Sequence, residues 1–356
     1  MFSYVVRKVL YGVAVLLGVA TLVFFLFNVL PGDPVRMMLG QRADEKDVQV
    51  IREELGLDKS IGYQYCSYLN DLSPVSFYKI KENQKEQFEK YKPYLIVAEI
   101  SDVAVLLKSP YLRYSYQSKR PVGEILSEAF PNTLILAVVA ISIALILGVT
   151  LGILTAVANN SVLNRITLFI TTIGMSLPSF FAAILMAWIF GFVLESVTGL
   201  SMTGSLYSVD DYGSGAYLDL KNLILPAVTL GLRPLAVVVE LTRTTLSDVM
   251  SMDYIRTAKA KGLRKWRVIT KHALRNAMTP VITAVSGWFA SMLAGAVFVE
   301  YVFDWKGIGV VIVDALDKFD FPVVMGAVLL IGVMLIIINI IVDIIYATLD
   351  PRVRLQ

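Results

Sequence analysis

The stretch TLILAVVAISIALILGVTLGILTAV, residues 133–157, decides the fold class, because none of its 25 positions carries a charge. About 20 apolar residues in a helix cross the hydrocarbon core of a bilayer. The whole chain of 356 residues is 56% hydrophobic, which is high for a soluble domain. Five further runs approach the same length: 9–30, 166–194, 223–241, 281–303 and 323–349. The sequence therefore predicts an all-α integral membrane protein with six transmembrane helices.

Prolines support the predicted ends of these helices. Pro131, Pro226, Pro280 and Pro322 stand at or near the starts of runs, where a helix has no use for the missing N–H. Pro178 instead falls inside the third run, so we expect a kink or a strong tilt there.

The distribution of basic residues predicts the orientation. The connector 242–280 carries nine Lys or Arg and two acidic residues, whereas 195–221 carries one basic and four acidic residues. Because positive residues stay on the cytoplasmic side, we expect this connector and both termini to be cytoplasmic. The first run, at 22 residues, is too long for a cleaved signal and is expected to be an uncleaved anchor.

Three regions follow from this layout: an N-terminal segment with the first helix at 1–30, an extracytoplasmic loop at 31–130, and a five-helix core at 131–356. The core includes a cytoplasmic coupling segment at 243–279. In the outer loop we expect a helix over 44–57 with Gly56 as its stop signal, and a surface helix or a hairpin over 94–107. Cys66 is the only cysteine, so the chain has no internal disulfide.

Several classes of chemistry are excluded by what the sequence lacks. It has no phosphate-binding loop of the G-x-x-x-x-G-K-[ST] type, no cluster of residues at metal-ligand spacing, and a single histidine, His272. We therefore predict that the chain is not an enzyme, holds no cofactor or metal and has no catalytic residue. The net charge of +3 derives from the basic connector, which indicates acidic lipid headgroups as a partner and not nucleic acid.

Polar and small residues inside the apolar runs are predicted to serve structural roles. Glu240 and Arg243 are expected to form an interfacial ion pair three residues apart. Small residues recur every fourth position at Ala140, Ala144, Gly148, Gly152 and Ala156, and again at Gly287, Ser291 and Gly295. Such stripes favour close helix packing, within the chain or across a dimer, over the lining of a wide pathway.

The basic connector is the most informative segment for function. Asp253 is expected to cap a short helix that runs to Ala260, and Gly262 to end it in a left-handed conformation before a second helix over 265–276. Tyr254, Leu263 and Trp266 are apolar or aromatic groups among charges. From composition alone, insertion into a cleft of another protein and contact with lipid headgroups are equally well supported.

This connector resembles the coupling motif of ATP-binding-cassette (ABC) importer permeases, and the whole chain resembles the dipeptide and oligopeptide branch, which includes nickel permeases, as a B-type subunit. The resemblance includes 28–34 (NVLPGDP), 54–58 (ELGLD), 130–133 (FPNT), 225–230 (LPAVTL), 300–309 (EYVFDWKGIG) and 342–352 (VDIIYATLDPR). The connector departs from the wider importer class at Arg256-Thr257-Ala258, as is typical of the peptide branch. About 35 residues near 73–110 exceed the usual length of the outer loop.

The resemblance implies a function and a set of partners. The chain would move short peptides across the bacterial cytoplasmic (inner) membrane by alternating access, as one multi-pass permease of a pair. Two cytoplasmic ATPases, which carry ATP and Mg, and an extracytoplasmic peptide-binding protein would complete the importer. Nickel or another small solute is the alternative substrate, and an ion-coupled carrier is the alternative class. The residues that would couple to the ATPase are Asp253, Tyr254, Arg256, Ala258, Lys259, Lys261, Gly262, Leu263, Arg264 and His272; no substrate-pathway residue is singled out.

Overall fold

A computed structural model describes residues 2–29, 35–36, 44–54, 57–79, 88, 91, 93–100, 103–158, 161–209 and 215–349. Gly56 and parts of the motifs at 28–34, 54–58 and 342–352 therefore lie outside the described residues. The chain divides into two compact units, one formed mainly by residues 1–128 and 311–336 and the other by residues 129–310 and 337–354. Each unit is described by itself.

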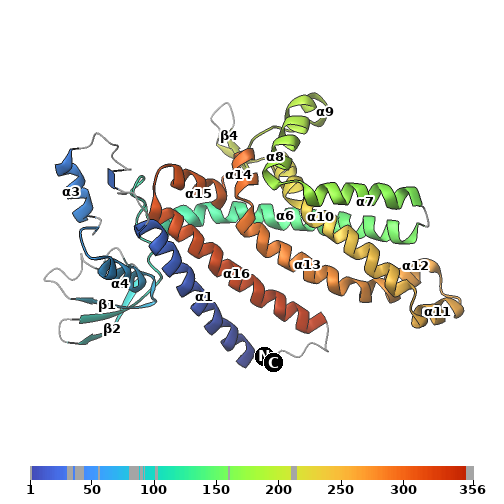
Figure 1. The fold of residues 1–356 in the computed structure, drawn as a ribbon, viewed down its shortest axis with the longest axis horizontal. Coiled ribbons are helices and arrows are strands. Elements are labelled where there is room, and N and C mark those ends of the chain that lie inside the picture. The colour runs from blue at the N-terminus through green and yellow to red at the C-terminus, as the bar shows by residue number, and fades with distance from the viewer. Residues whose placement is uncertain are drawn as a thin grey trace. The chain divides into compact units, whose positions relative to one another are not determined.

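Among the described residues, four helices are long and apolar enough to cross a membrane, and two bent helix pairs bring the possible number to six. The four are α1 (Phe2–Val29), α6 (Val122–Val157), α10 (Lys221–Met250) and α16 (Phe321–Leu349) (Figure 1). One bent pair consists of α7 (Ser161–Ser176) and α8 (Ser179–Trp188), which continues as the π-helix η2 (Ile189–Val193). The other joins α13 (Leu274–Gly295) to α14 (Val297–Phe303) at an angle of 58°.

The bend at Pro178 is much sharper than a kink. The axes of the two halves of this pair differ by 111°, and Pro178 stands in extended backbone immediately before α8. Proline has no N–H for the carbonyl four residues earlier, and its ring disfavours a helical conformation at the residue before it. The predicted interruption of the third run is confirmed, but as a break between two helices.

The other prolines differ from their predicted role as markers of helix starts. Pro131, Pro226 and Pro280 lie inside α6, α10 and α13, because α6 begins 11 residues, α13 seven residues and α10 two residues before its apolar run. Polar first turns outside the hydrocarbon core extend these helices, and hydropathy alone does not detect them. Only Pro322, the second residue of α16, stands at a helix start.

The first unit contains a small cap that includes a β-sheet. Its elements are α3 (Glu45–Glu54), α4 (Ile61–Leu72), β1 (Val75–Lys79), β2 (Tyr94–Ile100) and β3 (Val103–Lys108). The strands are antiparallel in the order β1-β3-β2. The helix predicted over 44–57 and the hairpin alternative over 94–107 are both confirmed, whereas the all-α description is wrong here, since β-branched and aromatic residues favour strands. The sheet lies within residues 73–110, the part of the chain that we expect to exceed the usual length of the outer loop.

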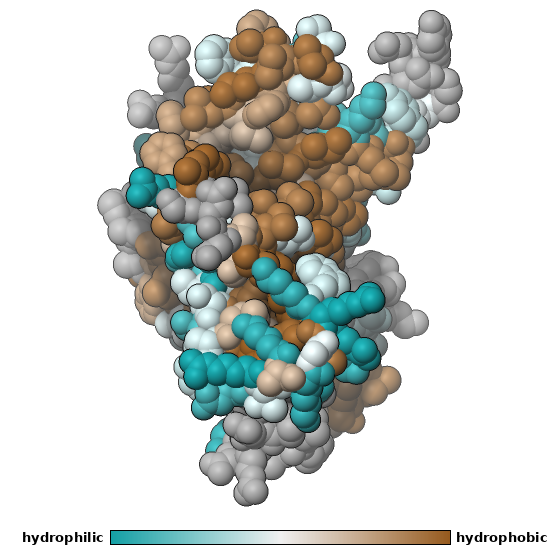
Figure 2. Space-filling view, turned by 90° about the vertical axis from the view of Figure 1, so that its right-hand side faces the viewer, coloured by the Kyte–Doolittle hydropathy of each residue, from teal (hydrophilic) through white to brown (hydrophobic). Residues whose placement is uncertain are grey.

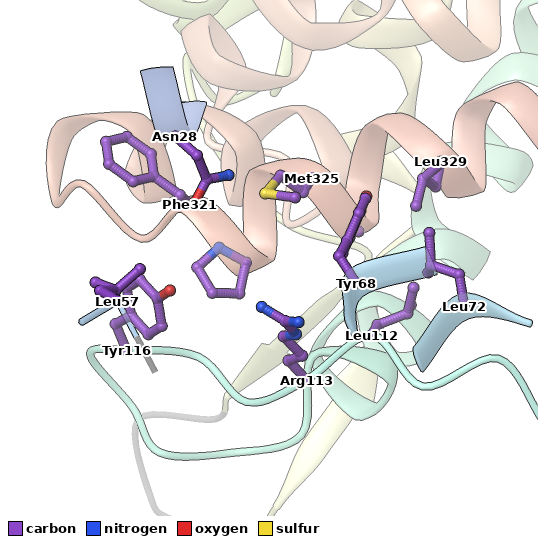
Figure 3. A pocket seen from close by; sticks show the side chains of 12 residues that line it. Asn28, Leu57, Tyr68, Leu72, Leu112, Arg113, Tyr116, Phe321, Met325 and Leu329 are labelled. Carbon is purple, nitrogen blue, oxygen red and sulfur yellow. The ribbon is translucent and has the colours of Figure 1, made fainter. Parts of the chain in front are cut away.

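The cap is fastened to the ends of two long helices of its own unit. Tyr68 stacks on Phe24 of α1 with 5.5 Å between ring centroids, and Thr21 shares a 2.7 Å hydrogen bond with Tyr65. Figure 3 shows Tyr68 and Arg113 of the cap facing Met325 of α16 across a small pocket. Phe24 lies about one and a half turns before the end of α1 and Thr21 about two turns before it, so the cap packs along that helix and not only on its tip.

The second unit packs its helices through small residues. A side chain at Gly152 of α6 would meet Thr242 Cβ of α10 at 2.5 Å, and one at Gly148 would meet Val238 at 2.7 Å. Ala140 and Ala144 are fully buried on the same stripe. The first small-residue stripe therefore packs within the chain, as predicted. Gly287 of the second stripe meets nothing within 4 Å and is exposed.

Two motifs from distant parts of the sequence form one joint in this unit. The Trp305 indole donates to the carbonyl of Asn132 at 3.0 Å, and the Asn132 amide donates to the carbonyl of Lys306 at 2.7 Å. Buried Glu300 accepts from the Gly309 N–H at 2.6 Å. The motifs at 130–133 and 300–309 are thus complementary halves of a hydrogen-bonded contact between the first third of α6 and the end of α14 with the chain that follows it.

The remaining elements are short. They are α9 (Glu195–Thr198), the hairpin β4 (Tyr207–Val209) and β5 (Ala216–Leu218), α11 (Asp253–Ala260), α12 (Lys265–Arg267), the π-helix η3 (Val268–Ala273) and α15 (Ile308–Asp317). Figure 1 shows α11 and α12 together at one end of α10 and α13.

Candidate coupling site

The site begins with α11, which ends at Ala260 as predicted but differs from the prediction at its N-cap. Met252, in extended backbone, occupies the N-cap position and makes no side-chain cap. Asp253 is instead the first helical residue, so the prediction that it caps α11 is wrong. Its carboxylate is almost fully exposed, accepts a 3.4 Å hydrogen bond from Arg256, and favours the helix through the positive end of the dipole.

The elbow after α11 is built by Gly262. Its φ of +77° is left-handed, as predicted, and two hydrogen bonds close the helix around it. The Gly262 N–H donates to Lys259 O at 3.0 Å, and the Leu263 N–H donates to Ala258 O at 3.4 Å. This double closure is the Schellman motif, in which an apolar contact from the residue after the glycine completes the turn.

The inner face of the elbow is apolar and packed. Ile255, Ala258 and Leu263 pack in a cluster with Leu246 of α10 and Val268 of η3. Ile255 is fully buried, and burying such a side chain contributes about 1.5–3 kcal/mol. The sequence offered Leu263 for contact with another protein or with lipid headgroups, but it is partly buried and packs against this internal cluster. The elbow is therefore fixed to α10 by its own core.

The outer face is basic and carries the two exposed aromatic residues. Tyr254 is 40% exposed and Trp266 is 67% exposed. Exposed basic residues surround them: Arg256, Lys259, Lys261, Arg264, Lys265 and Arg267. Figure 2 shows hydrophilic side chains gathered where α11 and α12 lie, on a face that is otherwise largely hydrophobic. We call this set the basic face.

The second arm of the elbow is continuous with a long helix. α12 passes without a break through η3 into α13. His272 is half-buried within η3, so it lies at the edge of the basic face. Asn276 of α13 donates a 2.8 Å hydrogen bond to the Tyr254 hydroxyl of α11. This bond braces the two arms of the elbow against each other, a contact that sequence reasoning did not foresee.

Two further polar features lie in the long helices. Arg243 donates to Glu240 at 2.7 Å and 3.3 Å, which confirms the predicted ion pair. Arg233 was not singled out, although it is the only charged residue between Leu223 and Val239. It is exposed in α10 and donates to the carbonyl of Met175, beside the α7–α8 break. A lone charge within an apolar run was the signal that could have found it.

Two pockets differ in what they could hold. The pocket of Figure 3 has a volume of about 20 Å³, enough for one water molecule and too small for a peptide. A second cavity of about 310 Å³ lies between α6, α13 and α16. Its lining is aliphatic and aromatic apart from Ser286, so it offers few partners for peptide amides.

Comparison with known families identifies the kind of protein to which this site belongs. Residues 148–355 match the family described as "Binding-protein-dependent transport system inner membrane component". Residues 1–80 match the N-terminal family of the same transport systems. The chain belongs to this permease family. Its elbow and its long helices are thus those of a multi-pass inner membrane permease.

Relatives of this permease match over its full length. It is 31% identical over 99% of its length to the dipeptide transport system permease protein DppB of Alkalihalophilus pseudofirmus, all of which is covered. It is 32% identical to the glutathione transport system permease protein GsiC of Escherichia coli K12, with 99% of each chain covered. These relatives are permease subunits and not ATPases, which agrees with the prediction for this chain.

The fold also matches a solved transporter. A chain of the MetNI methionine ABC transporter, in an inward-facing crystal form, has a TM-score of 0.50 at 16% identity. The match covers 64% of this permease and 97% of that chain. At this identity the likeness shows the fold alone, that of an ABC transporter permease core.

Proposed function

We propose that this permease is a subunit of an ABC importer that moves short peptides across the bacterial inner membrane. The observation that carries the proposal is the elbow: an exposed basic face fixed by an apolar inner face and continuous with α13. Full-length relatives named for dipeptide and glutathione transport support peptides as the substrate class. Because the chain has no phosphate-binding loop, ATP and Mg would be bound by partner subunits.

The proposed topology follows from the charge distribution. Six crossings, with α7–α8 and α13–α14 as two bent spans, leave both termini and the 243–279 coupling segment in the cytoplasm. The loop 31–130 with its cap is then extracytoplasmic, the first span is 1–30, and 131–356 forms the permease core. An extracytoplasmic peptide-binding protein would deliver substrate on that side, and a second permease would complete the pathway.

The proposed coupling residues act in two groups. The exposed side chains of Tyr254, Arg256, Lys259, Lys261 and Arg264, with Asp253 and half-buried His272 at the margins, contact the ATPase. Ala258, Gly262 and Leu263 act from inside by holding the shape of the elbow. Closure of the ATPases on ATP pushes the basic face, and the rigid elbow passes the movement to α10 and α13, which reorients the spans.

Co-purification of the importer tests this proposal. We expect Gly262→Leu to lose ATPase subunits or substrate-coupled ATP hydrolysis, because a branched side chain is strained at φ +77° although no atom obstructs it. Gly262→Asn is the matched control, since asparagine tolerates this conformation and should retain coupling. If Gly262→Leu assembles and transports normally, or if the wild-type chain captures no ATPase, the elbow is not a coupling element.

A further inference from the structure

A guanidinium group in the middle of a membrane-spanning helix, that of Arg233, has no carboxylate partner among the residues that the structure describes. Arg233 lies 10 residues, or about 15 Å, from one end of the apolar run 223–241 and about 12 Å from the other. In the part of the chain that the structure describes, no carboxylate lies within ion-pairing distance of it. Glu240, two turns later on the same helix, is already paired with Arg243.

The place where Arg233 points is a break in the neighbouring helix. α7 runs beside α10 and ends at Ser176, and α8 turns away after Pro178 (Figure 1). In an unbroken helix the carbonyl of Met175 would accept from the N–H of residue 179. Arg233 takes over this role, with Nε and Nη2 at 3.4 Å and 3.3 Å from Met175 O.

These two long bonds occupy only one edge of the guanidinium. The group has five N–H donors in a fixed fork, and the remaining donors of Arg233 are on an exposed side chain. A planar fork of this kind binds a carboxylate through two parallel hydrogen bonds. Broken helices are also where transporter folds build substrate sites near the bilayer midplane, because their unpaired backbone groups can contact a solute.

We propose that Arg233, with the α7–α8 break, binds the C-terminal carboxylate of a peptide in transit. This inference rests on the proposed function, since a short peptide that is carried across the membrane brings its own carboxylate with it. The peptide then supplies the counter-charge that the described part of the chain does not give Arg233, and the exposed Met175 side chain lies beside the bound end. A peptide whose terminus is an amide offers no negative charge to this site.

The test measures protection of a thiol next to the site in the complete importer. Met175→Cys is made in an importer whose other cysteines, including Cys66, are serine, and the rate of its alkylation is followed with and without peptide. Trialanine in excess should slow alkylation several-fold, whereas trialanine amide should not. No binding protein is added, so its own preference for the peptide terminus does not enter the result.

Two variants separate a binding role from a bracing role. Arg233→Gln keeps an N–H donor for Met175 O but removes the charge, and it should abolish protection by trialanine. Arg165→Gln removes an exposed arginine about 15 Å away along α7, and it should leave protection unchanged. Equal protection by the acid and the amide, protection that survives Arg233→Gln, or no protection by trialanine would each overturn the proposal.

Two accompanying measurements keep this result distinct from the proposed function. ATP-dependent uptake of trialanine by the wild-type importer is measured in proteoliposomes, with the binding protein added. If uptake fails, the peptide-import function is wrong; if uptake holds and protection does not depend on Arg233, only this inference is wrong. If Arg233→Gln instead releases the second permease from the complex, Arg233 pairs with that subunit and the inference is also overturned.

Discussion

At the scale of single residues, α6 and α10 pack so closely that the glycine positions between them have no room for a side chain. Gly152→Leu would place Cβ 2.5 Å from Thr242 Cβ and 2.9 Å from Val239 O, so the two helices must separate. We expect a loss of about 1–3 kcal/mol in stability, as for other overpacked sites. Thermal unfolding of the purified permease in detergent, followed by tryptophan fluorescence, measures this loss.

Gly18→Leu provides the comparison for that change. It is also a glycine in a long apolar helix, but nothing lies within 4 Å of its Cβ position. Its unfolding temperature should match that of the wild type. An equal fall for both variants would mean that leucine is disfavoured in these helices for reasons other than packing.

The elbow contains a second pair of residues with opposite expected effects. Ile255→Ala removes a fully buried side chain from the inner face and should cost about 2–5 kcal/mol, which loosens the elbow. Lys259→Ala alters only the basic face, so the stability of the permease alone should change by less than about 0.5 kcal/mol. We expect the lysine variant to weaken ATPase capture in a salt-dependent manner, and unchanged capture at low salt would exclude Lys259 from the contact.

At the scale of elements, the cap is a separate structure with its own response to pH. Burial raises the pKa values of Tyr68, Tyr78, Tyr91 and Tyr111 above the ordinary value near 10. In the unfolded cap these phenols ionise above about pH 10, while in the folded cap they stay protonated. Stability from these residues is therefore complete below about pH 10 and is lost as the pH rises further.

An alkaline jump monitored by tyrosinate absorbance measures this effect. Exposed phenols should ionise at once, and the cap phenols should follow in a slower phase limited by opening of the sheet. In the double variant Tyr78→Phe, Tyr91→Phe the slow phase should have a smaller amplitude, because two of the cap phenols have been removed. A single fast phase for all tyrosines in the wild type would contradict the buried environment. Lys108 has the opposite effect on the pH dependence of stability. Burial lowers its pKa, so its contribution to the stability of the cap rises with pH.

Elements also show where sequence reasoning reached its limit. Apolar run length located all the long helices, because the bilayer imposes a minimum length on any crossing. Run length misplaced the N-terminal ends of two helices, since α6 and α13 already begin before Pro131 and Pro280. At the elbow, Gly262 was identified from turn chemistry, whereas the inward direction of Leu263 and the brace from Asn276 to Tyr254 depend on tertiary contacts. A spacing pattern does not contain such contacts.

At the scale of the whole molecule, the orientation of the permease is tested with its one native cysteine. Cys66 is exposed in the cap, so a membrane-impermeant maleimide should label it from outside intact cells whose outer membrane is permeable. A thiol introduced by Lys261→Cys in a Cys66→Ser background should react only after the inner membrane is opened. The reverse pattern would invert the topology and would contradict the proposed contact between the basic face and a cytoplasmic ATPase.

The π-helix between the elbow and α13 has a mechanical consequence. Over residues 268–273 the chain is wound more widely than an α-helix, so one extra residue is held within the turn. One residue corresponds to about 100° of α-helical winding. Tightening this segment to α-helical winding would therefore rotate α13 about its own long axis while the elbow stays in place. If a force applied at the basic face tightened this segment, it would produce torque as well as translation, and the side chains that α13 presents would change without any hinge opening.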